Sequence, residues 1–140
     1  MLFRSVRFIE LIESGSSKNW DSHADMQEHI PRARNVDRAI AGLLKDLKSR
    51  GMLDDTLVVW TTEFGRTPHT DGPTGRSHHP YVFCSWLAGG GVRGGMTYGS
   101  SDDYGYEVAE DPVHINDFHA TILHLLGINH EQLKIGRAHV

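Results

Sequence analysis

The sequence predicts an α/β fold in which helices cover a mostly parallel sheet with one antiparallel strand. Wholly apolar runs at residues 56–60 and 81–87 are typical of strands, whereas residues 30–47 and 115–126 have the spacing of amphipathic helices. Strands and helices that alternate at these lengths favour a layered α/β domain. The composition, 39% hydrophobic and 23% charged, is that of a globular protein.

The first half of the chain contains one expected strand and one expected helix. Residues 6–12 alternate between apolar and polar side chains, which predicts a strand. Apolar residues then recur at spacings of three and four over 30–47, which predicts an amphipathic helix. The sequence leaves two possible starts for this helix: a capping box formed by Asp25 with Glu28, or a first turn at Pro31.

The second half continues the alternation. Residues 56–60 are apolar and β-branched throughout, as expected of a strand covered on both faces, and residues 81–87 form a second such run. The glycine-rich, acidic stretch 94–112 predicts a loop with a short strand at 96–98. The last predicted element is the helix at 115–126.

Both ends of the chain resemble translated sequencing-adapter DNA. Residues 2–5 and 134–140 can be encoded by adapter sequence, one in the reverse complement of the other. We therefore expect residues 1–5 and 134–140 to lie outside the natural protein, and residues 6–133 to be the C-terminal fragment of one domain.

Charge, hydropathy and cysteine content exclude several classes. Lys and Arg number 14 against 18 Asp and Glu, a net charge of −4, which argues against a nucleic-acid-binding surface. No apolar run reaches the roughly 20 residues of a membrane span. The single Cys84 excludes an internal disulfide framework and is predicted to be a buried core thiol. The sequence has ten histidines, and because histidine is the commonest metal ligand, metal binding is the function to look for in the motifs.

Ligand-type side chains follow two of the predicted strands. Asp21 and His23 come after the first, two residues apart, so that an extended backbone points both the same way. Glu63 comes directly after the apolar run 56–60. His78 returns to the same edge if the strand that follows it runs antiparallel to 56–60. Ligands bind where strands end in α/β sheets, so these four residues predict a divalent metal site.

Each of these residues also has a structural interpretation. Asp21 can cap a turn, with His23 on the surface. Glu63 can form a solvated ion pair with Arg66. Arg66 and Arg76 can hold an anionic substrate or remain solvated in polar loops.

Other features are assigned no chemistry. Of the neighbours His78 and His79, His78 is the favoured ligand. Gly89-x-Gly91-x-x-Gly94 formally matches a dinucleotide fingerprint, but the glycine-rich sequence after it cannot open a helix.

Five motifs together carry a family resemblance. They are Trp20-Asp21-Ser22-His23, Glu63-Phe64-Gly65-Arg66-Thr67-Pro68, Gly75-Arg76-Ser77-His78, Leu87-Ala88-Gly89-Gly90-Gly91, and Asp117 to Ile122 with Leu126-Gly127-Ile128. In this order they resemble the C-terminal part of the sulfatase-like domain of unknown function 1501, a bacterial family placed with the alkaline-phosphatase superfamily. The resemblance covers nearly all of residues 6–133.

The resemblance implies an α/β/α core in which one or two divalent ions bind a sulfate or phosphate ester. Zinc is the foremost candidate ion, with manganese or calcium as alternatives. The substrate would be a small anionic ester or a sulfated or phosphorylated glycan. Asp21 and His23 resemble the superfamily's Asp–His metal motif, and His78 resembles its late metal-binding histidine. Phe64 is a departure, because many members carry an imidazole ligand there.

The resemblance places the nucleophile upstream of this chain, so the fragment itself is expected to be inactive. The parent would be a metal-dependent hydrolase, exported to the periplasm or cell envelope. The alternative is a non-catalytic metal-binding or scaffold protein with the same fold, which the Phe64 departure favours.

Overall fold

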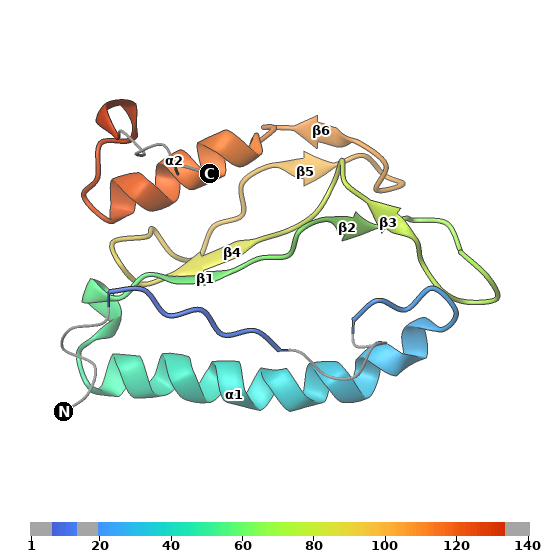
Figure 1. The fold of residues 1–140 in the computed structure, drawn as a ribbon, viewed down its shortest axis with the longest axis horizontal. Coiled ribbons are helices and arrows are strands. Elements are labelled where there is room, and N and C mark those ends of the chain that lie inside the picture. The colour runs from blue at the N-terminus through green and yellow to red at the C-terminus, as the bar shows by residue number, and fades with distance from the viewer. Residues whose placement is uncertain (1–6, 14–19, 134–140) are drawn as a thin grey trace, which may run out of the picture.

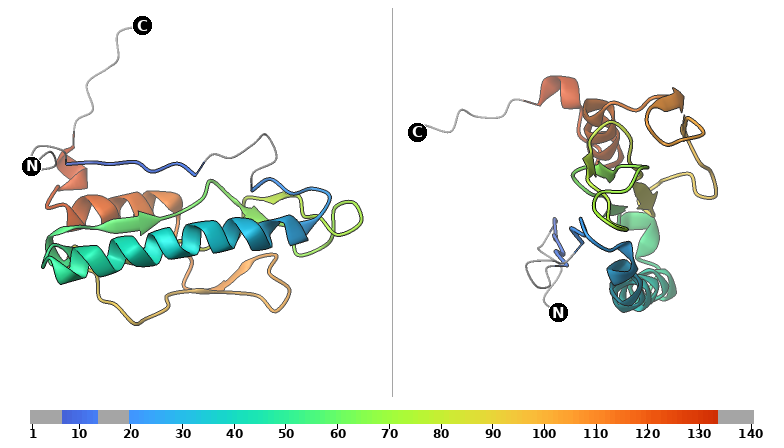
Figure 2. Two further views of the ribbon diagram at one scale, coloured as in Figure 1. Left: turned by 90° about the horizontal axis from the view of Figure 1, so that it is seen from below. Right: turned by 90° about the vertical axis from the view of Figure 1, so that its right-hand side faces the viewer.

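Two helices lie on opposite sides of a central pair of strands in the computed structural model, which describes residues 7–13 and 20–133 (Figures 1 and 2). In chain order the elements are α1 (His29–Ser49), β1 (Val58–Trp60), β2 (Gly65–Arg66), β3 (His78–His79), β4 (Trp86–Ala88), β5 (Ser100–Ser101), β6 (Val108–Glu110) and α2 (Ile115–Leu125). Short 3₁₀ turns occupy Met26–Glu28, Leu53–Asp55 and His130–Gln132.

The named strands form three antiparallel pairs: β1 with β4, β2 with β3, and β5 with β6. In the central pair, Val58 faces Ala88 and Trp60 faces Trp86. The strand β4 therefore runs opposite to β1. This is the direction that the prediction for His78 required, because it brings residue 78 back toward residue 63. No two named strands pair in parallel within residues 7–13 and 20–133. The mostly parallel α/β/α sandwich stays a prediction.

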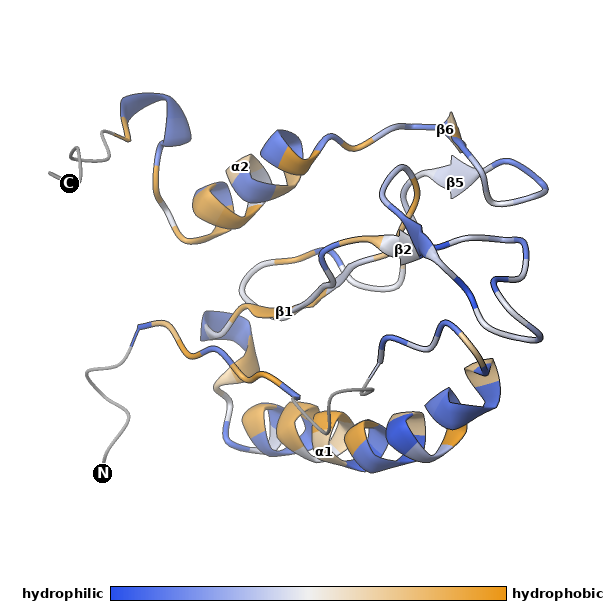
Figure 3. Cartoon of the chain, turned by 45° about the vertical axis from the view of Figure 1, so that its right-hand side comes forward, coloured by the Kyte–Doolittle hydropathy of each residue, from blue (hydrophilic) through white to orange (hydrophobic). Residues whose placement is uncertain are grey.

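The amphipathic pattern over residues 30–47 is confirmed as α1. Asp25 accepts a hydrogen bond from the Gln27 backbone N–H at 2.9 Å and caps the 3₁₀ turn that leads into the helix, so Pro31 falls in the first turn of α1. Gly51 follows the end of α1 with φ of +66°, the conformation that suits glycine there. Figure 3 shows hydrophobic and hydrophilic residues on different sides of α1.

The predicted C-terminal helix is confirmed as α2. His114 Nδ1 accepts from the Asn116 backbone N–H at 3.2 Å, and the Asp117 carboxylate accepts from the His114 N–H. This reciprocal capping box satisfies two N–H groups that the first turn leaves unpaired.

Two strand predictions are wrong. Residues 7–13 form no strand, and Phe8 and Leu11 are each 79% exposed. Residues 96–98 also form no strand, and the short strand begins at Ser100 instead. Alternation predicts an extended backbone, but a strand exists only where a second strand offers hydrogen-bond partners.

The expected burial of the strands is also wrong for the described residues. Val59 and Trp60 in β1 are exposed, and Cys84 is exposed rather than a core thiol. Leu47 of α1 is the only hydrophobic side chain classed as buried in the described part of the chain. Apolar composition indicates which residues can be buried, whereas burial itself requires another element against each face.

The expectations for residues 1–5 and 134–140, and the start of the predicted strand at residue 6, fall outside the described residues. None of the helices among residues 7–13 and 20–133 has both the length and the apolar character of a membrane-crossing helix.

Candidate metal site

The segment that carries Asp21 and His23 is held against the loop between β2 and β3. The Arg76 backbone N–H donates to the Ser22 carbonyl at 3.1 Å, and the Thr74 N–H donates to the Ala24 carbonyl at 3.3 Å. Residues 22–25 and 74–76 thus run side by side, joined by a parallel bridge between Asp25 and Thr74. This pairing places the two predicted ligands of the first segment beside the loop that leads to His78.

The two segments can lie this close together because residue 75 is a glycine and has no Cβ atom. A Cβ atom on Gly75 would lie 1.8 Å from the His23 carbonyl oxygen and 2.0 Å from its carbon. Gly75 is buried, and the atoms that its Cβ would meet belong to the backbone, which cannot rotate away as the end of a flexible side chain can. The Gly75 position therefore admits no side chain while the two segments stay paired.

The β2–β3 pair presents the other two polar side chains of the site. Arg66 and His78 are cross-strand partners in the register, so their side chains leave the same face of the ladder. His79, the next residue, points to the other face, where its Nε2 contacts the Tyr106 carbonyl at 2.8 Å. The alternation places His78 rather than His79 on the face that carries Arg66, and the role of His78 as a ligand stays a prediction.

Asp21, His23 and His78 converge on one point. Asp21 Oδ1 lies 2.8 Å from His78 Nε2 and 3.1 Å from His23 Nε2, and the two imidazole nitrogens are 3.3 Å apart. With ligands about 2.1 Å from a tetrahedral zinc ion, neighbouring ligand atoms would be about 3.4 Å apart. The three atoms therefore need shifts of only tenths of an ångström to bind one ion.

Arg66 borders this group. Its Nη1 donates to Asp21 Oδ1 at 2.6 Å, and its Nη2 donates to the Trp20 carbonyl at 3.3 Å. Its guanidinium carbon lies 5.8 Å from the centre of the Phe64 ring, and that ring lies 4.2 Å from the ring of His78. Phe64 thus packs against the candidate ligand His78.

The contacts around Asp21 and His23 favour their charged forms. Hydrogen bonds from His78 and then Arg66 lower the pKa of Asp21 from 3.8 to about 2. A hydrogen bond to Asp71, supported by the charges of Asp21 and Asp71, raises the pKa of His23 above its usual 6.5. A carboxylate that remains ionised in acid is suited to binding a cation.

We expect Asp21 to stay ionised at acidities where an ordinary aspartate is protonated. Its folded pKa is lowered, so the ionised carboxylate stabilises these contacts above pH 3.8, and this contribution is lost as the pH falls toward about 2. Carboxyl chemical shifts of the metal-free protein would give the midpoint. His78→Ala should raise the midpoint most and Arg66→Ala less, and a wild-type midpoint at 3.8 would contradict the expectation.

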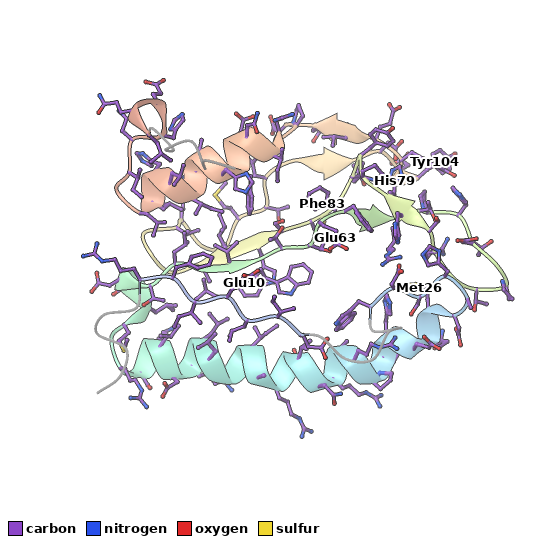
Figure 4. All side chains as sticks on the ribbon, viewed as in Figure 1. Glu10, Met26, Glu63, His79, Phe83 and Tyr104 are labelled. Atoms are coloured by element: carbon purple, nitrogen blue, oxygen red, sulfur yellow. The ribbon has the colours of Figure 1, made fainter. Side chains whose placement is uncertain are left out.

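Glu63 lies outside the group of three. Its carboxylate accepts from the Thr62 hydroxyl at 2.9 Å, and its pKa is lowered first by its own backbone N–H and then by Thr62. Figure 4 shows Glu63 on the stretch that leads from β1 to β2, with His79 on β3. The structure does not bring Glu63 into the group, and its role as a ligand stays a prediction.

Arg76 has a different environment from Arg66. Its Nη1 donates to the Pro68 carbonyl, and its backbone N–H holds Ser22. In the structure Arg76 therefore braces the β2–β3 loop, whereas Arg66 borders the three candidate ligands. The proposed contact of Arg76 with substrate stays a prediction.

Among the residues that the structure describes, Asp71 is the one close polar partner of the group that the sequence did not single out. Its Oδ2 lies 2.8 Å from His23 Nδ1. The Asp71-Gly72-Pro73-Thr74-Gly75 string indicates a turn, and that turn signal alone does not show which way the carboxylate points.

The comparisons with known proteins agree with the motifs. A family model described as "Protein of unknown function (DUF1501)" matches residues 1–138. No curated protein and no solved structure matches the chain. The predicted resemblance to this family is confirmed, and the placement in the alkaline-phosphatase superfamily stays a prediction. The chain belongs to the DUF1501 family.

Proposed function

We propose that this chain contributes the metal site of a metal-dependent hydrolase of sulfate or phosphate esters, on an α/β/α fold of the alkaline-phosphatase type. The observation that carries the proposal is the convergence of Asp21, His23 and His78, whose ligand atoms all lie within 4.8 Å of one another. One carboxylate and two imidazoles are the donors that zinc accepts in hydrolytic sites. Each is about half exposed, so an anionic ester can reach them from solvent.

Three residues of the site would bind the metal cation, and a fourth would bind the anionic ester. Asp21, His23 and His78 would hold the divalent ion, which when bound supplies positive charge to an ester oxygen. Arg66 orients Asp21 through Nη1. A guanidinium has five N–H donors, so Arg66 can keep its bonds to Asp21 and Trp20 and still donate to a sulfate or phosphate oxygen.

A second candidate function is metal binding without turnover. The observation that favours it is Phe64, whose ring packs on His78 at the position where the resemblance leads us to expect an imidazole ligand. The three converging residues suffice for one ion. A scaffold protein that keeps this single metal would need no nucleophile.

Zinc titration of the full-length protein, followed by assays with an aryl sulfate and an aryl phosphate, tests both functions. We expect one zinc ion per chain and hydrolysis of at least one ester. His78→Ala should weaken zinc binding by more than roughly 100-fold, because loss of even an outer hydrogen-bond partner of a ligand costs roughly 10- to 100-fold.

The matched control is His124→Ala, an exposed histidine in the last turn of α2. It should bind zinc and hydrolyse esters like the wild type. Zinc binding without hydrolysis would support the scaffold function. A wild-type protein that binds no zinc would contradict both functions.

A further inference from the structure

We infer that Asp71 is a positioning residue of the metal site, whose carboxylate fixes the orientation and tautomer of His23 for a divalent transition metal such as zinc. The inference rests on the proposed metal site and adds a residue to it. Asp71 lies 48 positions from His23 in the sequence, and no motif connects the two.

The two nitrogens of His23 face different partners. Nδ1 lies 2.8 Å from Asp71 Oδ2, whereas Nε2 lies 3.1 Å from Asp21 Oδ1 and 3.3 Å from His78 Nε2. An ionised carboxylate only accepts hydrogen bonds, so Nδ1 must carry a proton to bond with Asp71. In a neutral ring the lone pair is then left on Nε2, the nitrogen that faces the other two ligands.

The backbone around Asp71 holds its carboxylate in place. The Asp71 N–H donates to the Gly75 carbonyl at 2.9 Å, and the two residues form an antiparallel bridge. The same loop is joined to residues 22–25 through Thr74 and Arg76. Both ends of the His23–Asp71 contact are therefore fixed by backbone hydrogen bonds.

A surface ion pair is the alternative explanation, since both side chains are partly exposed, His23 at 42% and Asp71 at 44%. Isolated exposed pairs contribute little to stability. Two features separate this contact from such a pair. It is anchored on both backbones, and it acts on the ring whose other nitrogen meets Asp21 and His78.

Zinc affinity measured by competition with a chelator tests the inference in the full-length protein. Asp71→Ala should weaken binding by roughly 10- to 100-fold. Asp71→Asn keeps the size and an oxygen acceptor but lowers the basicity of the imidazole, so we expect roughly the tenfold end of that range. The control Asp103→Ala removes an exposed carboxylate from the loop between β5 and β6 and should leave affinity unchanged.

The tautomer of His23 gives a readout that altered packing would not mimic. In the metal-free protein at alkaline pH, ring ¹⁵N shifts should show Nδ1–H in the wild type and a mixture of both tautomers in Asp71→Ala.

Wild-type affinity and an unchanged tautomer in the Asp71 variants would overturn the inference while leaving the metal site in place. Asp71→Asn decides the matter if the alanine variant does not fold, because unchanged zinc affinity in it also contradicts the inference. A wild-type protein that binds no zinc would overturn the metal site and the inference together.

Discussion

Gly75→Ala is expected to abolish zinc binding and to lower the free energy of unfolding by about 3 kcal/mol, the upper end of the usual cost of overpacking. The added Cβ would lie 1.8 Å from the His23 carbonyl oxygen, far inside van der Waals contact. Residues 74–76 would have to separate from 22–25, and His23 and Asp21 would move away from His78. Denaturant unfolding and zinc titration measure the two effects.

Gly42→Ala is the matched control for this substitution. Gly42 lies within α1, and a Cβ there meets nothing within 4 Å. The change should leave zinc binding intact and stabilise the protein by up to about 1 kcal/mol, because alanine favours the helix. Gly75→Ala with wild-type stability and zinc affinity would show that the two segments are not held as the structure describes.

Asp21→Ala is expected to have the second-largest effect, a decrease in zinc affinity of more than roughly 100-fold. Asp21 is the only carboxylate among the three converging residues, and its Oδ1 is the shared partner of His23, His78 and Arg66. Without it, the remaining candidate ligands are two imidazoles that carry no negative charge, beside the Arg66 guanidinium, while the Asp71 carboxylate faces the other nitrogen of His23. A cation then loses its only negatively charged ligand and still lies near a guanidinium.

Asp21→Asn separates charge from shape in the same experiment. The amide keeps an oxygen for Arg66 and His78, so the fold around it should survive, whereas the charge that attracts the metal is gone. Zinc affinity should fall nearly as far as in Asp21→Ala. Wild-type affinity in Asp21→Asn would mean that Asp21 serves the Arg66 contact and not the metal.

The helices and part of the site could be predicted from sequence because their signals are local. Spacings of three and four along α1 and α2, and glycine after each, determine a helix and its end through the backbone of neighbouring residues. Asp21 and His23 share a direction because they are two residues apart. The strand expected at 6–12 is absent from its described residues, 7–12, and Cys84 is exposed. Both features depend on what packs against them.

The sequence by itself determined the family, the two helices and the side chains of ligand type at the candidate site. Only the tertiary structure decided which of these candidate ligands converge. His78 joins Asp21 and His23, Glu63 is not among the three, and Asp71 enters as a partner of His23. The physical reason is that these contacts join segments about 50 residues apart. Their geometry depends on the path of the backbone between these segments. The close approach at Gly75 and the β2–β3 register fix that path, and no local periodicity of the sequence encodes it.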